Sequence, residues 1–303
     1  MNLVKDFKVA QSELLFALQF GAFHMADDGR CSFHYTSLEG LKGILDSKEF
    51  WVTEYHYLND MEEFEYVDNL LREVLKEEFD TSEKYYILLE AVEKYLKESR
   101  ELCAHPEDSY YVVSFSKDSD NLTLWAEFAN YGCNFEANPY TLFDDAQVHM
   151  FHSVIYDTER QKELIRTSIR DSFENFFEGL EREFSLKTYL DALNAEQIVY
   201  VAKCIVELVV YYGMLMKNKL YANEQEFRVI FSGKNKEIFY KLKENLMVPY
   251  IKVPISDKEW LGERLTLAPL NHTEACKHSI KSFLRGKGYC KVDVEFSCIR
   301  LRY

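Results

Sequence analysis

His34 is the first residue of this chain that we expect to be able to contact a ligand, because it lies in a predicted strand just before a predicted helix. His34 lies near the start of the segment 33–64, where a short strand is followed by a helix with Ser37 as its N-cap. The first turn of a helix presents unpaired backbone N–H groups and a partial positive charge, and both favour a phosphate or another anion. The alternative interpretation of His34 is a packed, hydrogen-bonded residue of the protein interior.

Two charged residues late in the chain, Glu226 and Arg228, stand two positions apart in an expected strand over 224–231. Alternate residues of a strand point to the same side, so we expect both charged side chains on the same face of the strand as Ile230. If that face lines a cleft, Arg228 would hold Glu226 ionised and oriented. If it meets solvent, the two residues are an ordinary surface pair worth less than about 1 kcal/mol.

Other patterns that carry chemistry give weaker signals. The sequence contains no Walker loop, no GxGxxG and no GxSxG motif. His149 and His152 have HxxH spacing, but residues three apart on a strand point to opposite faces, so we expect no metal site there. The seven cysteines are an odd number, widely scattered and without a CxxC pair, which predicts reduced residues of the core.

Four groups of short motifs resemble a bacterial group catalogued as domain-of-unknown-function family 2971. The resemblance spans the chain from about residue 31 to its end, and it names no reaction. Its motifs are His-Tyr-Thr-Ser at 34–37 with Leu-Asn-Asp at 58–60, Val-Ser-Phe-Ser at 113–116 with Leu124-Trp125 and Tyr131-Gly132, the segment 221–231, and the tail 297–302.

The chain also resembles the ADP-ribosyltransferase fold of the His-Tyr-Glu type, which has a strand histidine early, aromatic residues in the middle and a strand glutamate late. The segment His34 to Ser37 matches its opening motif, although Lys48 replaces the glycine usual at the end of the following helix. The resemblance implies that His34 and Glu226 are catalytic and that NAD is the substrate, with no metal. It implies further contacts to NAD from Thr36, Ser37, Tyr55, Tyr57, Glu224 and Arg228.

In such a site, His34 and Thr36 would hold a ribose, and Tyr55 or Tyr57 would stack on nicotinamide. Glu226 would stabilise the positive charge that develops as the glycosidic bond opens, and Glu224, on the same face, would orient the acceptor. The hypothesis requires the strands of His34 and Glu226 to be neighbours whose side chains converge on one cleft.

The elements that must position these residues are helices and strands in separate stretches, without internal repeats. Helical periodicity predicts an opening helix in 3–25, two helices in 62–102, and three segments in 158–220 that break near Ser185 and Asn194. Short β-forming runs predict strands between and after these helices. We therefore predict a single α+β domain over residues 1–303 with a mostly antiparallel sheet and a large helical insert at 158–220, and the resemblance adds a split ADP-ribosyltransferase-like core.

Composition limits the partners of the chain. Its 303 residues include 36 Lys plus Arg against 51 Asp plus Glu, a net charge of −15, which opposes non-specific binding to nucleic acid. A local basic groove is compatible with that total. No apolar run approaches the roughly 18 residues of a membrane span, and Lys5, Asp6 and Lys8 interrupt the N-terminal segment, so we expect no membrane partner and a cytoplasmic location.

Two classes of function fit these features. The first is an enzyme that uses NAD or another nucleotide, by ADP-ribosyl transfer or NAD glycohydrolysis, in a bacterial defence or toxin system. The second is a non-catalytic nucleotide-binding sensor or a module that binds a protein partner. Release of free nicotinamide from NAD would distinguish the first class from the second.

Overall fold

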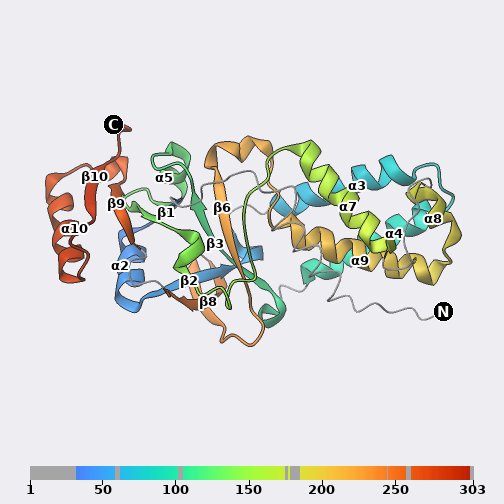
Figure 1. Cartoon of the computed structure of the whole chain (residues 1–303), viewed down its shortest axis with the longest axis horizontal. Helices are drawn as coiled ribbons and strands as arrows, with labels where there is room; N and C mark the ends of the chain where they lie inside the picture. Colours follow the sequence, from blue (N-terminus) through green and yellow to red (C-terminus); the bar gives the residue numbers. More distant parts are fainter. Residues whose placement is uncertain are drawn as a thin grey trace. The chain divides into compact units, whose positions relative to one another are not determined.

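A computed structural model of the chain describes residues 32–58, 62–101, 105–174, 177, 185–243, 245–256 and 261–300. The expected opening helix at 3–25 and the turn at 59–60 lie outside the described residues. Contacts within the chain group it into two compact units (Figure 1). The helical unit takes its described residues from 62–101 and 155–219, and the sheet unit takes them from 32–58, 105–154 and 220–300.

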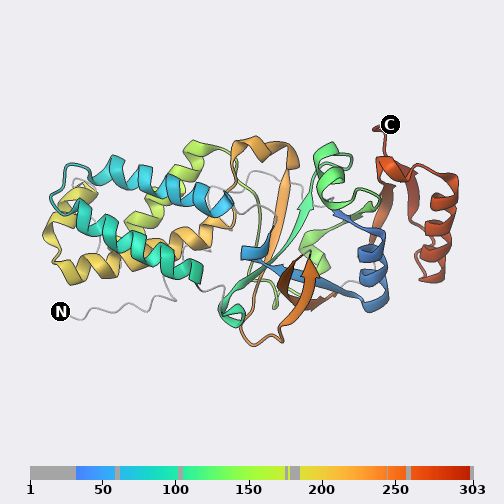
Figure 2. The ribbon, with the colours of Figure 1, turned by 180° about the vertical axis from the view of Figure 1, so that it is seen from behind.

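The helical unit consists of helices that lie side by side (Figures 1 and 2), and most of their buried residues are apolar. The N-cap of its most apolar helix is Asn194, which exchanges two hydrogen bonds with Gln197 in a capping box. The predicted breaks within 62–102 and 158–220 are confirmed. The helices are α3 (Glu62–Phe79), α4 (Tyr85–Glu101), α7 (Thr158–Glu174), α8 (Leu186–Ala192) and α9 (Ala195–Gly213).

The sheet unit contains ten strands among its described residues, and β9 and β10 are its parallel pair. The strands follow the order β10-β9-β4-β1-β3-β2-β8-β7, while β6 pairs with β3 and β5 pairs with β6. The predicted α+β class and mostly antiparallel sheet are confirmed. The strands are β1 (Ser32–Thr36), β2 (Glu49–Glu54), β3 (Tyr110–Ser116), β4 (Cys133–Ala137), β5 (Met150–Ser153), β6 (Glu226–Ser232), β7 (Phe239–Lys243), β8 (Leu246–Pro254), β9 (Leu261–Leu267) and β10 (Asp293–Phe296).

The sheet divides into two halves at β3. Strand β6 pairs with β3 over its whole length. At the other edge of β3, β1 pairs through Phe33 and Ser116, and β2 pairs near the opposite end through Thr53 and Val112. The half-sheets β10-β9-β4-β1 and β2-β8-β7 therefore leave the same edge of β3. The relation of this divided sheet to the ADP-ribosyltransferase fold stays a prediction.

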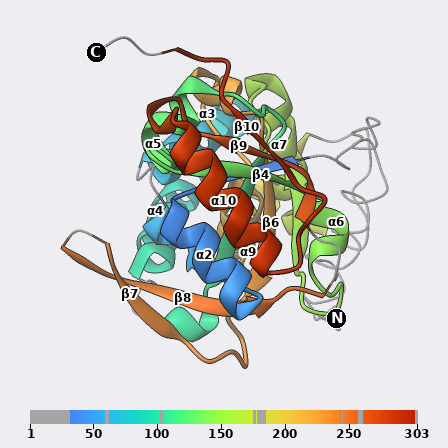
Figure 3. The ribbon, with the colours of Figure 1, turned by 90° about the vertical axis from the view of Figure 1, so that its left-hand side faces the viewer.

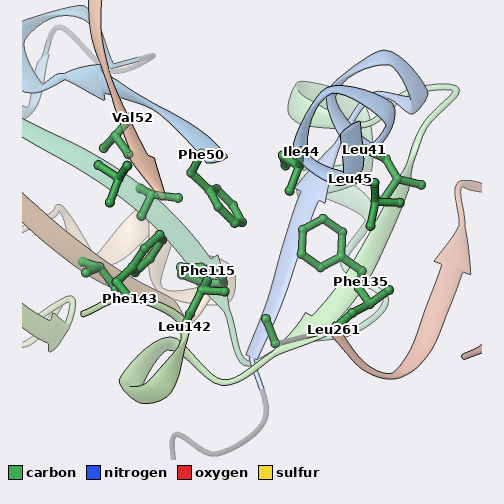
Figure 4. Close-up of a cluster of buried hydrophobic side chains, with 14 of the residues drawn as sticks. Leu41, Ile44, Leu45, Phe50, Val52, Phe115, Phe135, Leu142, Phe143 and Leu261 are labelled. Carbon is green, nitrogen blue, oxygen red and sulfur yellow. The ribbon is translucent and has the colours of Figure 1, made fainter. Parts of the chain in front are cut away.

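Helices α2 (Leu38–Ser47) and α10 (Glu274–Gly286) cover one face of the sheet (Figure 3). Leu41 and Leu45 of α2 and Leu284 of α10 belong to the same large apolar cluster as the inward side chains of the strands. Figure 4 shows part of this cluster, with Leu45 of α2 above Phe135 of one half-sheet and Phe50 of the other half-sheet to the side of the helix. We call this side of the sheet the apolar face.

The opposite side of the sheet carries a smaller apolar cluster, which includes Tyr35 of β1 and Trp125 of helix α5 (Leu122–Phe128). Several buried polar side chains share this side, so we call it the polar face. Short helices complete the sheet unit: η1 (Tyr55–Tyr57), η3 (Pro106–Asp108), α6 (Pro139–Leu142), η4 (Lys219–Glu224) and η5 (Pro269–Asn271).

The predicted single domain with a helical insert at 158–220 stays a prediction, because grouping by contacts does not show whether either unit folds by itself. The helical unit also includes 62–101. Among the described helices, none combines the length and the apolar character that crossing a membrane requires.

The cysteines do not all lie in the core. The prediction is confirmed for Cys133 and Cys204, which are buried, and wrong for Cys290 and Cys298, which are exposed on the sheet unit. Cys290 and Cys298 lie just outside the two ends of β10, where the alternation of buried and exposed residues along the strand no longer applies. Cys31 and Cys103 lie outside the described residues.

Candidate functional site

His34 lies on β1 with its ring turned into the apolar face. The ring centroid is 5.3 Å from that of Phe50, 5.5 Å from that of Phe115 and 5.4 Å from that of Phe135. Its Nδ1 atom is 3.0 Å from the carbonyl oxygen of Ser114. Solvent still reaches part of the residue, which is half-buried. His34 is therefore a packed, hydrogen-bonded histidine that keeps some access to the surface.

The contacts of His34 determine its protonation. A carbonyl oxygen only accepts, so Nδ1 must carry the proton in this hydrogen bond, and Nε2 of the neutral ring is an acceptor. Burial lowers the pKa of His34 to about 4, although the hydrogen bond to Ser114 acts in the opposite direction. The ring is therefore neutral near pH 7. Its Nε2 atom can accept a hydrogen bond from a hydroxyl group of a ligand, but the ring offers no positive charge.

The junction of β1 and α2 brings together three of the predicted site residues. Thr36 shares the face of His34, two positions away on β1, and Ser37 follows it as the exposed N-cap of α2. A Cβ on Gly40 would lie 2.2 Å from Thr36 Oγ1, and a Cβ on Gly132 would lie 2.1 Å from the Thr36 backbone oxygen. Both glycines thus permit a close approach of backbone to the end of β1.

Glu226 and Arg228 form a buried ion pair on β6. Arg228 Nε and Nη2 donate to the two carboxylate oxygens of Glu226 over 2.9 and 3.0 Å. Arg228 is 1% exposed and Glu226 is 8% exposed. Both side chains share the side of Ile230, as predicted. The solvated surface pair is excluded, and the bidentate geometry holds the carboxylate in one orientation.

His34 and Glu226 lie on opposite faces of the sheet. Directly paired residues of antiparallel strands share a face, and both Phe33 and Glu226 pair with Ser116 of β3. Phe33 and Glu226 therefore share the polar face, and His34, the next residue after Phe33, points to the apolar face. The predicted convergence of His34 and Glu226 on one cleft is wrong, because the neighbour of the histidine, not the histidine, faces the side of the glutamate.

The predicted placement of Glu224 on the strand of Glu226 is also wrong. Glu224 ends η4, and Gln225 has a left-handed φ of 47°, so β6 begins only at Glu226. The hydroxyl of Ser116 donates to the Glu224 carbonyl over 2.6 Å and anchors this turn to β3. Because the chain turns at Gln225, Glu224 does not continue the alternation of β6 and cannot be assigned to the face of Glu226.

The two aromatic candidates lie in η1, directly after β2. Tyr55 is only 4% exposed, which contradicts its predicted role as an accessible ring stacking on nicotinamide. Tyr57 is half-buried. Its stacking on a ligand stays a prediction.

A carboxylate and histidine network next to these tyrosines was missed in the sequence. The buried Glu54 accepts the His56 backbone N–H over 2.8 Å, and its other oxygen lies 2.6 Å from His56 Nδ1. The Ser109 hydroxyl donates to that same oxygen. These contacts cap η1 and orient the imidazole. The pattern Glu-x-His at the end of a strand was the available signal, but Ser109 is distant in sequence.

The polar face carries a second group of buried polar side chains across neighbouring strands. Asn134 of β4 pairs with Tyr35 of β1 on one side and with Thr266 of β9 on the other. Its amide nitrogen donates to the Ser119 carbonyl over 2.6 Å, whereas Asn134 Oδ1 has no hydrogen-bond partner among the residues that the structure describes. The Tyr35 hydroxyl donates to the Asp118 carbonyl over 2.8 Å. These contacts attach the loop before α5 to the sheet.

Comparisons with known proteins add no identity to these observations. Neither the models of protein families, nor the curated proteins, nor the solved structures include a match to this chain. The resemblance to family 2971 and to the ADP-ribosyltransferase fold stays a prediction. The fold alone does not determine a function, which depends on the geometry of the residues of the site.

Proposed function

We propose that the chain is a non-catalytic nucleotide-binding module whose ligand, NAD or a related nucleotide, contacts His34 and Thr36 at the junction of β1 and α2. The observation that carries the proposal is the fixed hydrogen-bonding state of His34. Its Nδ1 proton is engaged by Ser114, so a neutral ring presents an acceptor at Nε2. Thr36, on the same side of β1, adds a hydroxyl that both donates and accepts.

An acceptor and a hydroxyl two positions apart on one strand suit a ribose, whose adjacent hydroxyl groups donate and accept. The N-terminus of α2 follows directly and favours the phosphate of the same nucleotide. NAD fits this site only in part, because Glu226 points to the other face and cannot act on a ribose held by His34. A binding module therefore fits the geometry better than an enzyme built on the two residues.

Binding is tested by calorimetric titration with NAD, ADP-ribose and AMP. We expect saturable binding of at least one of these nucleotides, and we expect Thr36→Val to weaken it by about 5- to 10-fold, the effect of losing one hydrogen bond of about 1 kcal/mol. Thr123→Val is the matched control, because Thr123 is also a half-buried threonine but lies on α5. Absence of binding for all three nucleotides, or equal weakening by both substitutions, would refute the proposal.

Catalysis is tested separately with NAD and pure protein, by chromatographic measurement of free nicotinamide and mass spectrometry of the protein. We expect NAD to be recovered intact, with no mass added to the protein. Steady release of nicotinamide that Glu226→Gln abolishes would instead support an enzyme. A role in a defence or toxin system, and a protein partner, stay predictions.

A further inference from the structure

A second exposed surface of the sheet unit combines aromatic rings with lysines. It is formed by one side of three adjacent strands, β2, β8 and β7, of which β7 ends the strand order among the described residues (Figures 1 and 3). The strand pairings place Thr53, Tyr250 and Phe239 in one row, and Trp51 beside Lys252 in the next. These residues lie on the polar face, and we call this part of it, over β2, β8 and β7, the hairpin face.

The rings of the hairpin face pack against one another, and Trp51 is the ring that is open to solvent, because Tyr250 is buried. Trp51 is 52% exposed and stacks on Tyr250 with ring centroids 4.8 Å apart and planes 23° apart. Phe239 lies on the other side of Tyr250, with centroids 5.6 Å apart. One face of the Trp51 ring packs on Tyr250, which holds the half-exposed side chain rigid. The other face of the ring can stack with another flat group.

Lysines lie directly against these rings. Lys252 Nζ is 4.2 Å from the centroid of Phe239, and Lys241 Nζ is 5.8 Å from that of Tyr250 and 2.9 Å from Thr53 Oγ1. Burial and the charge of Lys243 lower the pKa of Lys241, so an approaching anion would stabilise its charged form. Residues 233–254 contain five lysines and two glutamates, whereas the whole chain has a net charge of −15.

We propose that the hairpin face binds single-stranded nucleic acid. Every nucleobase offers a flat ring that can stack on Trp51, and the lysines beside the rings meet the phosphates. A single strand is required, because bases stacked in a duplex are not free to lie on a protein ring. An acidic protein would meet the lysines but would leave the exposed ring unused, so the combination favours nucleic acid.

This surface is independent of the proposed nucleotide site. On β2, Phe50 points to the apolar face and contacts His34, and the next residue, Trp51, points the opposite way. Substitutions at Trp51 therefore leave the contacts of His34 in place. Failure of one proposal does not imply failure of the other.

Binding is measured by fluorescence anisotropy with labelled 15-nucleotide oligo-dT and oligo-U, and with a duplex of the same length. We expect both single strands to bind more tightly than the duplex. Trp51→Ala should weaken binding by about 5- to 100-fold, the range for loss of one stacked base, and Trp51→Phe should retain most of the affinity. Tyr131→Ala is the matched control, because Tyr131 is a 66% exposed aromatic residue elsewhere on the sheet unit.

Salt dependence tests the lysines. If Lys241 and Lys252 neutralise two phosphates, the logarithm of the affinity should fall with the logarithm of salt concentration with a slope of about −1.4. Lys252→Gln should make this slope less steep by about 0.7, whereas Lys42→Gln, at an exposed lysine of α2, should leave it unchanged.

Three outcomes would overturn the proposal: no binding at 50 mM salt, equal affinity for the duplex, or equal loss in Trp51→Ala and Tyr131→Ala. Thermal unfolding of each variant must first show a midpoint close to that of the wild type. If Trp51→Ala fails this check, Trp51→Phe and Lys252→Gln still decide the question. If the first outcome occurs and the face captures an acidic protein instead, the partner is a protein and not a nucleic acid.

Discussion

His34 is a neutral side chain held between aromatic rings, and this state has a consequence for stability. Its pKa in the folded protein is about 4, below the ordinary value of 6.5 that applies in the unfolded chain. Between these values the unfolded chain takes up a proton that the folded protein does not. The free energy of unfolding must therefore fall as the pH decreases from 6.5 towards 4, and the contribution of His34 is complete above pH 6.5.

We predict that His34→Gln reduces the acid sensitivity of the fold. Between pH 7.5 and 5.0, the wild type should lose about 2 kcal/mol more of its free energy of unfolding than the variant, because only the wild type has this titrating ring. Urea unfolding at the two pH values measures the difference. His105→Gln, at an exposed histidine, is the control and should behave as the wild type. Equal acid sensitivity of His34→Gln and the wild type would contradict the prediction.

The Glu226–Arg228 pair predicts a different loss. Because both side chains are buried, Glu226→Gln removes a bidentate negative partner from a buried guanidinium, and we expect a cost of about 3 to 5 kcal/mol in the free energy of unfolding. Adding Arg228→Met should cost less than the sum of the single changes. Denaturant unfolding measures this coupling.

The exposed pair of Lys42 and Asp46 provides the comparison for that measurement, and Lys42→Ala should cost less than about 1 kcal/mol. A similarly small loss in the free energy of unfolding for Glu226→Gln would show that the buried pair does not stabilise β6. The expected cost also means that loss of any activity in Glu226→Gln cannot be assigned to chemistry unless the variant is shown to be folded.

Among the elements, the contact between β1, α2 and the turn before β4 depends on glycine. A methyl group at Gly132 would meet the Thr36 backbone, which cannot move without shifting β1, whereas a methyl group at Gly43 meets nothing within 4 Å. The two glycines therefore differ in their neighbours: Gly43 lies within α2, and Gly132 lies against the residues that precede it.

We expect Gly132→Ala to lower the free energy of unfolding by about 2 to 3 kcal/mol through overpacking. Gly43→Ala, on the exposed side of α2, should raise it by about 0.5 to 1 kcal/mol, because alanine loses less conformational freedom in a helix. Thermal or denaturant unfolding of the two variants gives the comparison. Equal effects of the two substitutions would show that the close approach at Thr36 is not required.

Over the whole molecule, the charge is unevenly distributed and the chain alternates between the two units. The chain passes between its units, since the helical unit takes 62–101 and 155–219 from within the stretches that form the sheet unit. The net charge of −15 repels anions from most of the surface, but the excess of lysines in 233–254 offers them one region of approach. The overall charge therefore sets the background for binding and does not exclude a local site.

Much of this structure was predictable from local sequence. The breaks near Ser185 and Asn194, the N-cap at Ser37 and the shared side of Glu226 and Arg228 follow from helical period, capping chemistry and the alternation of a strand. These features depend only on residues a few positions apart. The turn at Gln225 was missed because a left-handed residue other than glycine leaves no clear signal in the sequence.

The assembly of the site was decided only by the tertiary structure. Alternation along β1 and β6 determines which residues of each strand share a side, but it does not relate the sides of two strands that are far apart in the chain. That relation is set by long-range register, here the pairing of both Phe33 and Glu226 with Ser116. A shift of one residue in either pairing would have placed His34 and Glu226 on the same face.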